Sequence, residues 1–242
     1  MKSRMAEELR LKHQPVAVLF ADEKPEGATQ FQEGKWGCVV AMHNAATKGR
    51  TVAFSRKTYG CPGGGVGLGF GDQYATNLPD IDGFLSTGTE TREGEHYFKT
   101  PEMARAFWDA LPITDIPHEY VVFRPLADLA DDETPELVNF YVNPDQLSAM
   151  VVLANYGRST VDNVVVRMGA GCHTLCLIPY AEGHREPQRA VIGLFDITTR
   201  SKVDPDILSF SMPYRMFQEM EANVPGSFFE YKDWLEVRKR LG

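Results

Sequence analysis

The sequence predicts an α/β or α+β fold, a single mixed-sheet domain with flanking helices. Two observations lead to this prediction. Short apolar runs typical of strands alternate along the whole chain with amphipathic segments typical of helices. No linker is long enough to separate two domains, and the acidic, proline-containing segment 127–136 is interpreted as a surface loop. Residues 1–242 are therefore expected to fold as one domain.

Six segments carry helix signals. The clearest is 100–112, in which Thr100 can cap the first turn and Pro101 suits the first helical position. In 144–157, Pro144 stands at the start and Gly157 at the end. In chain order the predicted helices are 3–12, 36–49, 100–112, 144–157, 213–224 and 231–241.

Six short apolar runs predict strands. They cover residues 15–20, 51–55, 119–126, 136–143, 163–169 and 189–197. Two of them, 51–55 and 163–169, are each followed by small residues and a glycine-flanked cysteine. This pattern is compatible with an internal repeat. It is also compatible with the tendency of α/β proteins to place sites at the carboxyl ends of strands.

The composition excludes some classes of protein. A formal charge of −8 and a pI of about 5.3 argue against a nucleic-acid partner, which normally requires a basic surface. The longest apolar stretches, such as 149–154, are too short to span a membrane. The N-terminal residues lack the apolar core of a signal peptide. A cytoplasmic protein without structural disulfides is expected.

The four cysteines are the main candidates for chemistry. Cys38, Cys61 and Cys172 each stand beside glycine or proline, in the contexts WGCV, GCPGGG and GAGCHTLC. Glycine leaves backbone N–H groups free to donate to a sulfur, and four thiolates complete a zinc site or an iron–sulfur cubane. However, the chain has no C-x-x-C pair, and buried inert thiols are a competing interpretation.

Two residues are candidates for the fourth ligand. Cys176 follows Cys172 by four positions, so a helix would place both sulfurs on one face. His173 could complete the site instead. The expectation is that Cys38, Cys61 and Cys172 converge, with Cys176 as the fourth metal ligand.

Other motifs are absent. The glycine-rich stretch 60–71 matches neither the dinucleotide fingerprint nor a phosphate loop. The sequence also lacks the G-x-S-x-G and H-E-x-x-H motifs.

The order of these motifs resembles a known family. GCVVAMHNAATKG, YGCPGGGVGLGF, VNPDQLSAMVVLANY, GAGCHTLC and FSMPYRMFQEM occur in the order seen in the DUF169 family (domain of unknown function 169), over residues 5–225. The resemblance implies that Cys38, Cys61 and Cys172 occupy the family's cysteine positions. It also implies relatives among anaerobic bacteria and archaea, but no reaction.

Together, the residues and the resemblance predict an iron–sulfur protein, with [4Fe-4S] as the expected cluster and zinc as the alternative metal. Gly63, Gly64 and Gly65 are expected to wrap the cofactor and donate N–H groups to sulfur. The role would be electron transfer, redox sensing or small-ligand binding, with a redox partner or a small molecule and a possible homodimer. Two alternatives remain open: a metal-free protein whose glycine loop binds a small molecule or an anion, and a thiol enzyme that uses Cys61.

Overall fold

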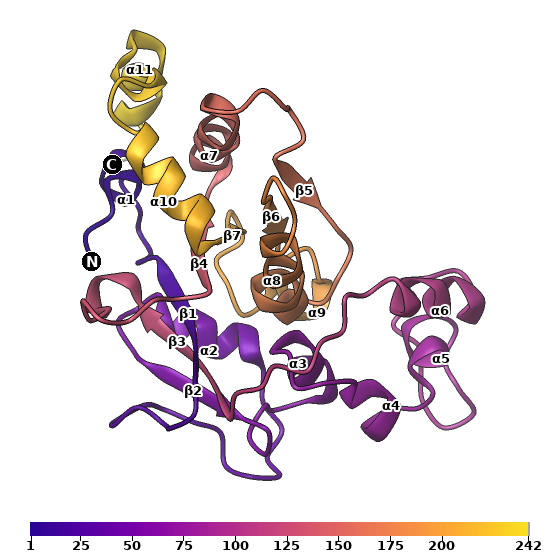
Figure 1. Ribbon diagram of the computed structural model, residues 1–242. Coiled ribbons are helices and arrows are strands. Elements are labelled where there is room, and N and C mark those ends of the chain that lie inside the picture. Colours follow the sequence, from indigo (N-terminus) through magenta and orange to yellow (C-terminus); the bar gives the residue numbers. More distant parts are fainter. Residues whose placement is uncertain (242) are drawn as a thin grey trace.

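One seven-stranded mixed sheet organises the fold (Figure 1). The structure, a computed structural model, describes residues 1–241. The strand order is β2-β3-β1-β4-β7-β6-β5, and of the neighbouring pairs only β5 and β6 run parallel. In chain order the strands are β1 (Val16–Ala21), β2 (Val52–Ser55), β3 (Tyr120–Pro125), β4 (Leu137–Val142), β5 (Val164–Val166), β6 (Ala190–Gly193) and β7 (Leu208–Pro213).

Eleven α-helices accompany the sheet within the described residues, which makes the protein a single α+β domain. They are α1 (Arg4–Glu8), α2 (Val39–Ala46), α3 (Pro62–Gly67), α4 (Gln73–Asn77), α5 (Ile81–Leu85), α6 (Pro101–Asp109), α7 (Pro144–Tyr156), α8 (Ile178–Gly183), α9 (Ile197–Arg200), α10 (Tyr214–Asn223) and α11 (Lys232–Lys239). A π-helical turn, η2 (His173–Leu177), runs directly into α8, and two short 3₁₀ turns, η1 (Leu126–Asp128) and η3 (Phe228–Glu230), complete the set. None of the helices in residues 1–241 has the length and apolarity needed to cross a membrane.

The two faces of the sheet are covered by different helices. Strand β4 shows the alternation: Val138 and Phe140 point to one core, whereas Leu137 and Tyr141 point to the other. The first core is closed by α1, α7, α10 and α11. The second is closed by α2, the segment after α3, and the π-helical turn. All four cysteines belong to this second side.

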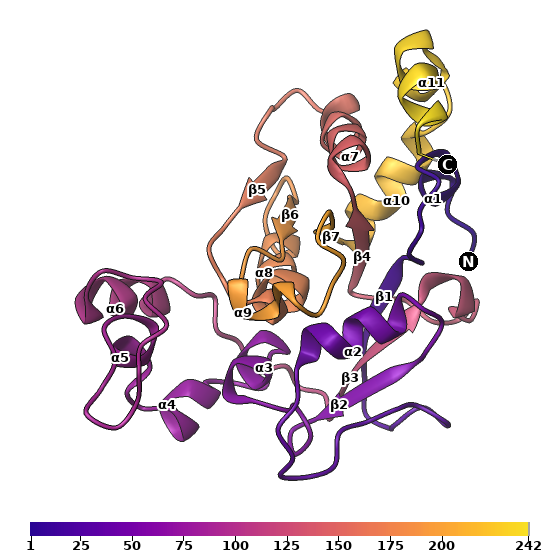
Figure 2. The same cartoon turned by 180° about the vertical axis from the view of Figure 1, so that it is seen from behind.

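Helices α4, α5 and α6 form an insert between β2 and β3 that extends away from the sheet (Figures 1 and 2). A separate small apolar cluster anchors it to the body of the protein. In that cluster Tyr74, Ile81 and Trp108 of the insert region pack with Val66 of α3 and Leu177 of the π-helical turn. The insert therefore forms a separate group of helices next to the face of the sheet that carries the cysteines.

The predicted helices and strands are confirmed, most of them with shorter bounds, and three differences stand out. The run 163–169 gives only the three-residue strand β5, and β7 was not predicted. The glycine-rich stretch after β2, expected as a loop around a cofactor, begins with helix α3.

Candidate functional site

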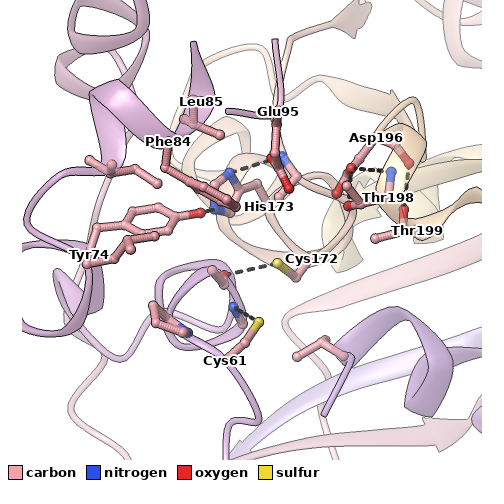
Figure 3. Close-up of a pocket in the computed structure, with 18 of the residues that line it drawn as sticks. Cys61, Tyr74, Phe84, Leu85, Glu95, Cys172, His173, Asp196, Thr198 and Thr199 are labelled. Atoms are coloured by element: carbon pink, nitrogen blue, oxygen red, sulfur yellow. Dashed lines mark hydrogen bonds between the residues drawn. The ribbon is translucent and has the colours of Figure 1, made fainter. Parts of the chain in front are cut away.

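A cavity of about 410 Å³ lies between the helices of the second face and the α4–α6 insert (Figure 3). Four separate parts of the chain line it: residues 36–40, 61–64, 74–107 and 168–202. Its size is within the range of small-molecule and cofactor sites. The cavity is therefore the candidate functional site.

Three of the four cysteines line this cavity, and each stands where a helix begins. Cys38 is the N-cap of α2 and Cys61 the N-cap of α3, while Cys172 directly precedes the π-helical turn. Of the three, only Cys61 accepts a capping hydrogen bond through its sulfur, from the Gly64 amide. Local π-helical turns such as this one often occur at functional sites.

The sulfurs of Cys61 and Cys172 point toward the same space from opposite sides (Figure 3). The Gly64 amide donates to the Sγ of Cys61 at 3.2 Å, and the Cys172 thiol donates to the Gly63 carbonyl at 3.0 Å. Burial is the main cause that raises the pKa of Cys61, and the same cause raises that of Cys172 further. Without a metal, both groups are neutral thiols at pH 7.

The glycines of α3 serve close packing more than cofactor wrapping. Gly63 and Gly64 line the cavity, but a Cβ on Gly64 would collide with the Tyr59 carbonyl oxygen. Gly65 does not line the cavity, and a Cβ there would come within 2.5 Å of Gln73. The six-residue helix thus uses glycine to fit between neighbouring segments.

Cys176 lies apart from the other three cysteines. It is 3% exposed and packs in the second core, and it does not line the cavity. Burial raises the pKa of its thiol strongly. Three of the four expected ligands, Cys38, Cys61 and Cys172, thus line one cavity, whereas Cys176, the fourth, packs in the core.

His173 lines the cavity, but its ring is already engaged. Its Nδ1 accepts from the Ala170 amide at 3.2 Å, so the proton of the neutral ring is on Nε2. Nε2 then donates to the Tyr74 hydroxyl, 3.2 Å away. Burial lowers the pKa of His173 to about 4, in agreement with a neutral imidazole. Neither ring nitrogen is aimed at a thiol.

Asp196 is a buried carboxylate at the edge of the cavity. It accepts from the Tyr97 hydroxyl at 2.9 Å, from the Gly171 amide at 3.1 Å, and from both the amide and the hydroxyl of Thr198. These donors fix the carboxylate next to the start of the Cys172 helix. Neither Asp196 nor Tyr74 was identified from the sequence. For Asp196 a signal existed, because it lies at the carboxyl end of the predicted strand 189–197.

No group of three or more His, Cys, Asp or Glu side chains in residues 1–241 is arranged to hold a single metal ion. A cluster makes a different demand, because each thiolate binds its own iron and the sulfurs can stand farther apart. Three thiols that line one cavity, with an amide donor at Cys61, are compatible with that demand.

Comparison with family models matches residues 4–223 to a family described as "Uncharacterised ArCR". No curated protein and no solved structure matches the chain. The matched range contains every segment that lines the cavity, including the insert and the three cysteines.

Proposed function

The chain belongs to the DUF169 family, and we propose that it holds an iron–sulfur cluster of the cubane type expected from the sequence through Cys38, Cys61 and Cys172. The observation that carries the proposal is that these three residues, far apart in sequence, each begin a helix at one cavity. A cluster bound by three thiolates would keep one iron free of protein ligands, which suits the binding of a small ligand; electron transfer and redox sensing are the other roles such a cluster would serve.

Two features of the site speak against the alternatives. A thiol enzyme needs a thiolate and a nearby base, but burial raises the pKa of Cys61 and the His173 ring is engaged with Ala170 and Tyr74. A glycine loop for anions needs free backbone donors, but the amide of Gly64 donates to Cys61 and that of Gly65 bonds within the first turn.

Reconstitution under anaerobic conditions tests the proposal. The purified protein is incubated with ferrous iron and sulfide, desalted, and analysed for iron, acid-labile sulfide and visible absorption. We expect a brown protein with about four irons per chain. Each of the single variants Cys38→Ser, Cys61→Ser and Cys172→Ser should lose most of the iron, because a hydroxyl replaces a thiolate ligand poorly.

Cys176→Ala is the matched control, since it removes a thiol that packs in the core. It should retain the iron and lower the free energy of unfolding by about 1 kcal/mol. Equal iron content in all four variants, or a colourless protein with one zinc per chain, would contradict the proposal. Iron loss in the Cys176→Ala variant would instead support the four-cysteine site expected from the sequence.

A further inference from the structure

The part of the cavity formed by the insert differs in character from the cysteine-lined part. Its walls are mostly apolar, with aromatic and aliphatic side chains. The side chains that contribute rings to the whole cavity are Trp36, Tyr74, Phe84, Tyr97, Phe98 and Phe107. Phe98 and Phe107 stack with their centroids 5.0 Å apart. The faces of such rings attract weakly hydrated cations.

Two carboxylates face the same space. Asp196 is 5% exposed and receives its hydrogen bonds from neutral donors. Glu95 is half-buried on the insert, and Figure 3 shows it at the cavity. Within residues 1–241, neither carboxylate forms an ion pair. Asp196 is stabilised by four hydrogen bonds from neutral groups, so the negative charge of the two carboxylates is not neutralised by a cationic side chain.

The basic residues of the cavity lie at its rim. Arg92 is exposed and places its guanidinium over the Phe84 ring, 5.1 Å from the centroid. Lys202 is also exposed. Two acidic groups in the cavity have a raised pKa. The pKa of Glu95 is raised first by burial and then by the negative charge of Asp196. That of Tyr97 is raised first by burial, and Asp196 and Glu95 contribute in the same direction.

We infer that the cavity binds a small organic cation, an ammonium group that carries an apolar part, with Glu95 and Asp196 as counter-charges and the aromatic side chains as walls. This inference goes beyond the cluster proposal and does not require it. The thiols stand at the starts of α2, α3 and the π-helical turn, whereas Glu95 and five of the six aromatic residues lie between α5 and α6 or within the insert helices.

The test uses metal-free, reduced protein and two probes of nearly the same shape. Choline carries a quaternary ammonium, and 3,3-dimethylbutan-1-ol is its uncharged counterpart. Both are titrated by isothermal calorimetry at constant ionic strength. We expect choline to bind at least about tenfold more tightly than the alcohol, because only the cation interacts with the rings and carboxylates electrostatically.

Two variants and one control assign the effect to residues. Glu95→Gln should weaken choline binding about fivefold, because it removes one half-buried counter-charge, and should not change binding of the alcohol. Phe98→Leu should weaken choline binding about threefold through the lost ring face. Glu93→Gln is the matched control: Glu93 is exposed in the same loop and does not line the cavity.

Saturable choline binding that weakens in Glu95→Gln and not in Glu93→Gln supports the inference. Equal affinity for the two probes, no saturable choline binding, or equal loss in both glutamate variants overturns it. Since the protein is metal-free, these outcomes are independent of the iron content measured after reconstitution. A failure of the cation site is therefore distinguishable from a failure of the cluster.

Discussion

Gly67 of α3 lies so close to Cys172 that a Cβ on Gly67 would come within 2.7 Å of the cysteine Sγ. The same Cβ would be 2.9 Å from the carbonyl carbon of Cys172, so rotation of the cysteine side chain alone would not relieve the collision. Two of the three cysteine-bearing segments are thus held together by a backbone contact. Glycine is needed at this position because of this close contact and not because of an unusual backbone angle.

Replacement of Gly67 by alanine should force α3 and the Cys172 segment apart. We expect Gly67→Ala to lower the free energy of unfolding by about 1–2 kcal/mol, because the strain of overpacking exceeds the helix propensity gained. Urea denaturation measures the change. Gly183→Ala serves as control, since its nearest contact would be Pro213 at 3.3 Å, and it should change stability by about 0.5 kcal/mol or less. Equal effects in the two variants would show that the Gly67 contact relaxes freely.

The thiol of Cys61 should react slowly in the metal-free protein. Because burial raises its pKa, the thiolate fraction at pH 7 is smaller than that of a free cysteine. Its alkylation by iodoacetamide, followed by peptide mass spectrometry, should be slower than that of glutathione and should accelerate as the pH rises above 9. Cys176, buried in the core, should react only after unfolding. Alkylation of Cys61 faster than glutathione at pH 7 would instead support the thiol-enzyme alternative.

His43 should make the protein less stable in mild acid. This residue is fully buried, its Nε2 lies 3.2 Å from the Asn139 amide nitrogen, and burial lowers its pKa to about 3. The folded state keeps the ring neutral, whereas the unfolded chain takes up a proton below about pH 6.5. The free energy of unfolding therefore falls as the pH decreases from 6.5, by about 1.4 kcal/mol per pH unit from this residue.

The variant His43→Gln isolates that contribution, because His173 and the other titrating groups are unchanged. Urea titrations at pH 7, 6 and 5 should show a shallower pH dependence in the variant than in the wild type. Parallel profiles for the two proteins would mean that His43 becomes protonated without unfolding.

The bond between Tyr74 and His173 should contribute measurably to stability. Tyr74→Phe retains the edge-to-face contact with Trp108 but removes the acceptor for the buried Nε2–H of His173. We expect a loss of about 1–3 kcal/mol in the free energy of unfolding, because a buried donor is left without a partner. Tyr156→Phe provides the comparison: its hydroxyl donates to the Gly226 carbonyl on the surface, so the loss should be about 0.5 kcal/mol. A smaller loss at Tyr74 than at Tyr156 would contradict the assignment.

Local signals predicted the regular parts of the fold. The start of α7 is encoded locally, since Asn143 and Gln146 form a capping box and Pro144 is the first helical residue. Strand β4 follows the apolar run 136–143 closely. Strand β7 was not predicted, although the alternation of serine with apolar residues in its sequence, LSFSMP, is a strand signal; the run stands directly before the helix signal that begins at residue 213.

The candidate site could be predicted only in part. Glycine and proline beside Cys38, Cys61 and Cys172 indicated special backbone positions, and the structure places all three at helix starts around one cavity. Helical spacing alone could not separate Cys176 from Cys172, because the spacing fixes only their relative positions and not which side faces the core. The aromatic wall depends on how the insert packs against the body, which no local pattern in residues 74–107 reveals.

The position of β7 has a consequence for synthesis on the ribosome. Although β7 is the last strand to be made, it lies between β4 and β6, and β5 joins the sheet only through β6. A nascent chain that ends before residue 208 therefore lacks the strand that joins β6 and β5 to the rest of the sheet. The sheet on which the three cysteine-bearing segments are arranged is therefore complete only when nearly the whole polypeptide has left the exit tunnel.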